Sequence, residues 1–92
     1  MRLEGSCHCG SVRFSLKSAH PYPFNRCYCS ICRKTQGGGG YAINLGGDYA
    51  SLSVEGEEHL GVYHARDTRA PDGISPLGRH FCKHCASNLW CY

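Results

Sequence analysis

The chain has no long apolar run and no long run of one charge, and these absences exclude several classes of protein. It opens with Met1-Arg2-Leu3-Glu4-Gly5-Ser6, without the apolar stretch of a signal peptide, so we expect a cytoplasmic protein. No stretch is long and apolar enough to span a membrane. The ten Lys and Arg residues are scattered, which gives no electrostatic case for a nucleic-acid partner.

A helical period of three turns is also absent, and so is any internal repeat. Short alternating segments, with turn residues between them, predict a mainly β, single domain of short antiparallel strands over residues 1–92. His20-Pro21-Tyr22-Pro23 ends the first of these segments. Ser30 to Thr35 predicts a short helical turn with Ser30 as N-cap, and Arg66 to Gly78 a surface loop. The expected strands cover residues 11–17, 41–45, 49–54, 59–65, 79–82 and 87–92.

Cysteine, by contrast, is abundant: eight residues in 92, of which seven fall into three short clusters. These are Cys7-His8-Cys9, Cys27-Tyr28-Cys29-Ser30-Ile31-Cys32 and Cys82-Lys83-His84-Cys85. Tight C-x-C and C-x-x-C knuckles aim two sulfurs at one point, as a metal site needs, whereas disulfide frameworks spread their cysteines. A redox role for the last pair lacks a surrounding βαβ pattern. Sulfur ligation also suits an iron–sulfur cluster, but zinc is the favoured metal.

The number of clustered cysteines predicts two different zinc sites. The two pairs supply four thiolates, as in a closed tetrahedral site, and the triplet supplies three, which leaves a fourth position open to water or substrate. A zinc shared by the first and last pairs would clip the two ends of the chain together and couple metal binding to folding. Such cross-links are a usual remedy for the marginal core of a domain this small.

The formal charge of the chain changes when metal is counted. The value of +3 treats every cysteine as neutral. Seven metal-bound thiolates contribute −7 and two zinc ions contribute +4, which takes the charge to zero. The basic balance of the bare sequence is therefore no argument for an acidic partner.

The three clusters resemble those of a known family. C-H-C-G near the start, C-x-C-x-x-C-R-K about twenty residues later, and R-x-F-C-x-x-C-x-S-x-L near the end are similar to the glutathione-dependent formaldehyde-activating enzymes, which include centromere protein V. The resemblance runs from Gly5 to Leu89. It implies a small zinc-stabilised β-tent-like domain with zinc knuckles. It also implies a structural zinc on Cys7, Cys9, Cys82 and Cys85, and a catalytic zinc on Cys27, Cys29 and Cys32.

Three features depart from the family pattern. Tyr28 stands where the family usually has histidine between the first two triplet cysteines, and Ala86 stands where it often has glycine after the last knuckle. Family members also continue past the final strand, whereas this sequence stops at Tyr92. We therefore expect a C-terminally short member or a fragment.

The resemblance implies a zinc-dependent carbon–sulfur lyase, similar to S-(hydroxymethyl)glutathione synthase. An open three-thiolate zinc holds a thiol such as glutathione as the thiolate, which then attacks formaldehyde or another small aldehyde. The alternative is a non-catalytic, zinc-stabilised binding module in which a fourth protein ligand closes the triplet. Cys91 is a candidate for that ligand, but a small apolar residue beside Trp90 is its simpler interpretation.

Other side chains have both a functional and an ordinary interpretation. A proton acceptor would help the chemistry, and His59, His64, His80 and His84 are candidates, although ordinary surface or core roles are commoner. Arg33 and Lys34 either attract glutathione carboxylates or form a solvated helical face. Gly37 to Gly40 forms a substrate rim or a plain loop, and no Gly-Lys-Ser/Thr follows to make a phosphate loop. The aromatics are expected in the core: Tyr22, Phe24, Tyr28, Tyr41, Phe81 and Trp90.

Overall fold

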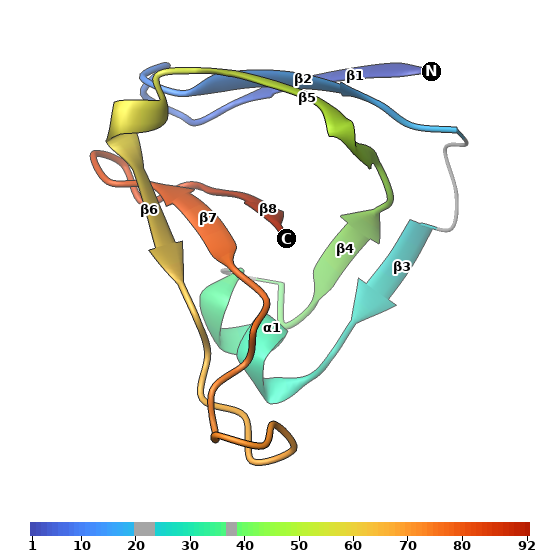
Figure 1. Ribbon diagram of the computed structural model, residues 1–92, viewed down its shortest axis with the longest axis vertical. Helices are drawn as coiled ribbons and strands as arrows, with labels where there is room; N and C mark the ends of the chain where they lie inside the picture. Colours follow the sequence, from blue (N-terminus) through green and yellow to red (C-terminus); the bar gives the residue numbers. More distant parts are fainter. Residues whose placement is uncertain (20–23, 37–38) are drawn as a thin grey trace. The chain divides into compact units, whose positions relative to one another are not determined.

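The computed structural model describes residues 1–19, 24–36 and 39–92, with only the backbone described for Phe24 and Asn25. It confirms a mainly β chain of short strands (Figure 1). The strands are β1 (Arg2–Ser6), β2 (Arg13–Lys17), β3 (Phe24–Cys27), β4 (Ala42–Leu45), β5 (Asp48–Glu55), β6 (Leu60–Tyr63), β7 (Arg79–Cys82) and β8 (Asn88–Cys91). The helices are α1 (Ser30–Thr35) and the 3₁₀ turn η1 (Glu57–His59).

The chain forms two compact units. The first unit is Met1–Glu4 with Ser15–Ser53, and the second unit is Gly5–Phe14 with Val54–Tyr92. The second unit therefore combines an early segment with the last part of the chain, as a clip between the two ends requires. That residues 1–92 act as a single domain stays a prediction.

The strands form three small sheets. β2 lies between β1 and β5, β3 pairs with β4, and β7 lies between β6 and β8. The β3–β4 pair is antiparallel and sets Cys27 opposite Ala42. The β6–β7–β8 sheet is antiparallel too, with Leu60 opposite Cys82 and a register shift between His80 and Phe81. Each cysteine cluster therefore begins at the end of a strand that a neighbour holds in register.

Two aromatic rings in the second unit cover glycines on neighbouring strands. The ring of Phe14 lies where a side chain at Gly5 would be, and the ring of Phe81 lies where one at Gly61 would be. Gly61 and Phe81 are partners across the β6–β7 ladder. An aromatic ring packed over a cross-strand glycine compensates for the missing side chain and helps to fix the register.

The core of the second unit is built on cysteine. Cys7, Val12 and Cys82 form a buried cluster. Packed against it, and partly buried, are Val54, Leu60, Cys85 and Leu89. Within the described residues the buried apolar side chains are Cys7, Val12, Cys32, Ala42, Ala65 and Cys82, three of which are clustered cysteines. So small an apolar core agrees with a domain that depends on metal cross-links.

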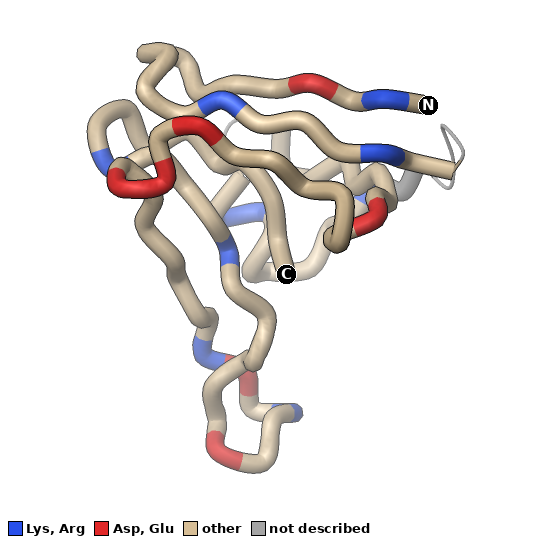
Figure 2. Tube along the Cα trace, turned by 45° about the horizontal axis from the view of Figure 1, so that its top comes forward, with Lys and Arg blue, Asp and Glu red and all other residues tan. Residues whose placement is uncertain are grey.

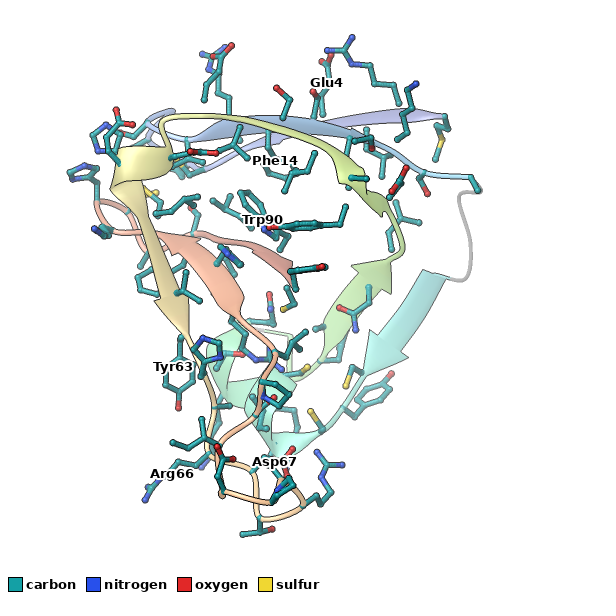
Figure 3. All side chains as sticks on the ribbon, in the orientation of Figure 1. Glu4, Phe14, Tyr63, Arg66, Asp67 and Trp90 are labelled. Atoms are coloured by element: carbon teal, nitrogen blue, oxygen red, sulfur yellow. The ribbon has the colours of Figure 1, made fainter. Side chains whose placement is uncertain are left out.

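A second packing group surrounds Trp90 on β8. The ring of Phe14 meets it edge-on with ring centroids 4.9 Å apart (Figure 3), and His80 stacks on it at 5.1 Å. Trp90 is half-buried, as are Tyr41 and Phe81, so the expectation that these aromatics lie in the core is met only in part.

Some local expectations are wrong. Cys29, not Ser30, is the N-cap of α1, because its sulfur accepts the backbone N–H of Cys32. Tyr28 is not a core residue, since the residue is 58% exposed. The His20-Pro21-Tyr22-Pro23 break, the first half of the glycine run at Gly37 and Gly38, and the core position of Phe24 lie outside what the structure describes.

Candidate metal centres

Four cysteine sulfurs meet in the second unit. Cys7 and Cys9 come from the turn after β1, and Cys82 and Cys85 from the turn after β7; all four Sγ atoms lie within 4.8 Å of one another. Figure 1 shows the β1–β2 and β7–β8 turns at the same end of this unit. We call these four residues the closed group. The sequence prediction that the first and last pairs come together is thus reproduced by the geometry.

The spacing within the closed group fits a tetrahedral thiolate site. Cys7 Sγ and Cys9 Sγ are 3.6 Å apart, and Cys9 Sγ and Cys82 Sγ are 3.7 Å apart. Two zinc–sulfur bonds of about 2.3 Å at the tetrahedral angle separate their sulfurs by about 3.8 Å. A disulfide would need about 2.05 Å, and every cysteine in the chain is free. The donor set therefore fits zinc and does not fit a disulfide.

Hydrogen bonds lower the pKa of two thiols of the closed group, and burial raises the pKa of a third. The Ser87 hydroxyl, 3.1 Å from Cys85 Sγ, is the main reason why the pKa of Cys85 falls to about 5. Burial raises the pKa of Cys82 to about 11. For Cys7, burial acts upward, but the Val12 N–H and the neighbouring Cys9 and Cys82 outweigh it, so its pKa is lowered. A bound cation would supply the stabilisation that the buried Cys82 thiolate lacks.

Three cysteine sulfurs meet in the first unit. Cys27 ends β3, Cys29 caps α1 and Cys32 lies in its first turn, and their Sγ atoms lie within 4.8 Å of one another. We call these residues the open group. In the described part of the chain no other His, Cys, Asp or Glu joins them. Cys29 is exposed and Cys32 is buried, so the group has one side toward the α1 backbone and another toward solvent.

The helix backbone prepares one member of the open group for metal binding. The Cys32 N–H donates to Cys29 Sγ at 3.3 Å. This hydrogen bond, helped by the Cys27 and Cys32 side chains, lowers the pKa of Cys29 to about 7. The thiolate is the form that binds metal. The lowered pKa therefore favours the metal-binding form of Cys29 toward neutral pH.

Aromatic and basic side chains flank the open group. The Arg26 guanidinium lies over the Tyr41 ring, 5.2 Å from its centroid, and the Tyr28 and Tyr41 rings are 5.7 Å apart. A hydrogen bond with Tyr28 raises the pKa of Arg26. Arg33 and Lys34 are exposed in the last turn of α1. Three cationic side chains, those of Arg26, Arg33 and Lys34, therefore lie within seven residues of the triplet cysteines in sequence. Ring contacts hold Arg26 in place.

The candidate proton acceptors and Cys91 all belong to the second unit. His64 Nδ1 lies 3.2 Å from the Ser75 carbonyl, and His80 Nδ1 lies 3.2 Å from the Gly78 carbonyl. His59 and His84 face each other. Cys91 is exposed at the end of β8 and is in neither cysteine group. Ordinary structural contacts therefore account for His64 and His80.

Sequence reasoning missed the hydroxyls that support the closed group. Ser87 Oγ accepts the His8 N–H at 3.0 Å and also contacts Cys85, so it joins the first knuckle to the last. Ser11 Oγ lies 3.2 Å from Cys9 Sγ. Both serines follow a cysteine by two residues, and this spacing is the signal that was available.

A mainly β domain with one group of four cysteines and one of three defines the class: a small cysteine-rich domain that could hold metal ions. The family model for the glutathione-dependent formaldehyde-activating enzyme matches residues 2–92, and the chain belongs to that family.

The chain is also similar to two particular proteins, one by sequence and one by structure. A protein of Halomonas elongata, provisionally named a glutathione-dependent formaldehyde-activating enzyme, is 64% identical over 93 residues. The alignment covers 100% of this chain and 57% of that protein, so the chain spans little more than half its relative's length. A crystal structure of a Rhodobacter sphaeroides protein matches with a TM-score of 0.74 at 27% identity, covering 97% of this chain and 72% of the other.

In the described residues, no helix has the length and apolarity to cross a bilayer.

Proposed function

We propose that this chain is a zinc-dependent carbon–sulfur lyase domain acting on the adduct of glutathione, or another thiol, with formaldehyde or a small aldehyde. In the direction of synthesis, the thiol sulfur bonds to the carbonyl carbon and the thiol proton ends on the carbonyl oxygen. The observation that carries the proposal is the contrast between the two cysteine groups. One has four sulfurs and the other has three with an exposed face.

In this scheme the two groups have different roles. Cys7, Cys9, Cys82 and Cys85 hold a structural zinc, and Cys27, Cys29 and Cys32 hold a catalytic zinc. When bound, the second zinc supplies a position at which a thiol is stabilised as thiolate. Cys29 contributes through its low pKa, because it enters the metal-binding form near neutral pH.

The surroundings of the open group suit an anionic thiol. Glutathione carries carboxylates, and Arg26, Arg33 and Lys34 offer guanidinium and ammonium groups beside the triplet in sequence. Arg26 is the best positioned of the three, because Tyr28 and Tyr41 limit its freedom. Tyr28, which replaces the usual family histidine, thus takes part in orienting a cation.

Cobalt substitution tests the proposal directly. A protein with cobalt in both groups should change its visible absorption on addition of glutathione, because a new sulfur ligand enters the open group. S-methylglutathione keeps the peptide but forms no thiolate, and it should leave the spectrum unchanged. The Cys29→Ala variant should keep the closed-group spectrum and lose the response.

Two outcomes would contradict the proposal. An unchanged spectrum at saturating glutathione, in protein with two cobalt ions, would favour the non-catalytic binding module. Thiol binding without any acceleration of exchange between formaldehyde and its glutathione adduct, measured by NMR, would contradict lyase activity in this chain.

A further inference from the structure

Two histidines outside both cysteine groups face each other on the surface of the second unit. His59 Nδ1 and His84 Nε2 are 2.8 Å apart, with ring centroids 4.7 Å apart and ring planes at 58°. His59 ends η1, and His84 lies in the turn after β7. Figure 1 shows η1 and the β7–β8 turn side by side.

The backbone holds this pair together. The Lys83 N–H donates to the His59 carbonyl at 2.8 Å, so the residue before His84 is tied to His59. The start of η1 is fixed as well, because Gly56 has φ +83° and the Ser11 carbonyl lies where its side chain would be. The two rings are thus brought together by main-chain contacts rather than only by their own hydrogen bond.

Glu58 leaves the facing nitrogen of His59 available. Glu58 Oε1 lies 3.4 Å from His59 Nε2, on the opposite side of the ring from His84. A carboxylate at this distance favours a proton on Nε2, which would leave Nδ1 with its lone pair. Metal-binding histidines usually donate their other N–H to a carboxylate or carbonyl in this way.

The distance between the facing nitrogens suits a metal with right-angled bonds. Two metal–nitrogen bonds of about 2.05 Å that meet at a right angle place their nitrogens about 2.9 Å apart, against about 3.4 Å at the tetrahedral angle. The observed 2.8 Å is that of a hydrogen bond between the two rings and is also close to the first value, so a metal with right-angled bonds would replace the shared proton with little movement of the rings. Square-planar or tetragonal geometry is typical of Cu(II) and Ni(II) on nitrogen and oxygen ligands.

Charge and exposure also suit an added cation. Glu57 and Glu58 precede His59, and the turn between β5 and β6 is acidic (Figure 2). Lys83 is the cation next to His84 in sequence and is exposed. The His59 side chain is 35% exposed, so water can fill the remaining coordination positions.

We propose that His59 and His84, with Glu58 behind His59, form a third metal site: an open pair of imidazoles for a square-planar or tetragonal divalent metal. It uses none of the seven clustered cysteines as a ligand and does not depend on the proposed lyase activity, but it adjoins the closed group, because the His84 backbone N–H donates to Cys82 Sγ at 3.4 Å. Ni(II) is the probe of choice, because Cu(II) binds more strongly than zinc across most ligand sets and would compete for the cysteines.

The test is a Ni(II) titration of the zinc-loaded protein, followed by calorimetry and by paramagnetic broadening of histidine NMR signals. One Ni(II) should bind, with the zinc content unchanged by native mass spectrometry. His59→Ala and His84→Ala should each weaken binding at least about 10-fold, and Glu58→Gln about 10-fold. His64→Ala is the matched control, since His64 is an exposed histidine that contacts the Ser75 carbonyl instead.

Several results would overturn the third site. They are the absence of Ni(II) binding, equal affinity in His59→Ala and the unmodified protein, loss of binding in His64→Ala, and Ni(II) uptake with release of zinc. His59→Gln keeps the size of the side chain, so it repeats the test if His59→Ala lowers the melting temperature.

Discussion

At the scale of single residues, Ser87 shows how a side chain that is not a ligand tunes the closed group. Its hydroxyl contacts Cys85 Sγ and accepts the His8 N–H, and it is the main cause of the low pKa of Cys85, about 5. Since a proton and a metal compete for the same sulfur, Ser87 would extend the binding of a metal at the closed group toward acid pH.

Ser87→Ala should therefore weaken zinc at the closed group by about 10-fold or more. Without the hydroxyl, the pKa of Cys85 rises, so protons displace the metal at a higher pH. The midpoint of metal release on acidification, followed by cobalt absorption, should move upward. Ser53→Ala, at an exposed serine on β5, is the control, and an unchanged midpoint in Ser87→Ala would show that the hydroxyl does not act on Cys85.

The residues that sequence reasoning identified and those that it missed differ in a physical way. Cys27, Cys29 and Cys32 were found because ligand spacing is local and the residue type is rare. The contact of Arg26 with Tyr41 was not found, because those residues are far apart in sequence and meet only across the β3–β4 ladder, which pairs Arg26 with Ile43. A contact that depends on strand register cannot be read from local composition.

At the scale of elements, alternation predicted most strands to within a residue or two. β7 (Arg79–Cys82) agrees with its predicted range, and β5 and β8 nearly do. β1 was missed because Leu3 is its one large apolar residue; its other inward position is Gly5, which the Phe14 ring covers. β3 was missed because it has four residues and no alternation.

The turn after the last knuckle contains a strained residue. Ala86 has φ +63°, a left-handed conformation that is unfavourable for a residue with a Cβ atom. The turn requires this conformation, because two backbone hydrogen bonds close it. The Ala86 N–H donates to the Cys82 carbonyl at 2.8 Å, and the Cys82 N–H donates to the Ser87 carbonyl at 3.0 Å. This position is the one at which the family often has glycine, so the departure carries a cost in stability.

Ala86→Gly should raise the free energy of unfolding by about 0.5–1 kcal/mol. Relief of the left-handed strain is worth about 1–2 kcal/mol, and the extra freedom of glycine in the unfolded chain offsets about 0.4–1 kcal/mol of it. Ala50→Gly on β5 should instead lower stability by about 0.5–1 kcal/mol, because glycine weakens a strand. Denaturant unfolding of both variants measures these changes in the free energy of unfolding. A lower free energy of unfolding for Ala86→Gly would show that the turn is not strained.

At the scale of the whole molecule, the chain divides into two units with one cysteine group each. The second unit unites residues 5–14 with residues 54–92, and its core contains Cys7 and Cys82. The pairing of the first and last knuckles was predictable, because four thiolates complete a tetrahedral site. The division into units was not predictable. It depends on the points at which β1, β2 and β5 leave one unit and enter the other.

The two cysteine groups should respond differently to loss of one ligand. Cys82 is fully buried and lies in the core cluster, so Cys82→Ala should remove one of two zinc ions and unfold the second unit, because metal and core fail together. Cys29 is exposed at the N-cap of α1, so Cys29→Ala should also lose one zinc but keep the second unit folded.

Val12→Ala separates the loss of metal from the loss of packing. Val12 is as buried as Cys82 and belongs to the same cluster, but it provides no ligand. Its truncation should lower the free energy of unfolding by about 1–3 kcal/mol and leave both zinc ions in place.

Native mass spectrometry with thermal melts of the three variants gives zinc content and stability side by side. Equal melting losses for Cys82→Ala and Cys29→Ala, or two zinc ions retained in Cys82→Ala, would falsify the division into a structural and an open site. If Cys82→Ala behaved like Val12→Ala, the core would be stabilised by packing alone, with metal incidental to the fold.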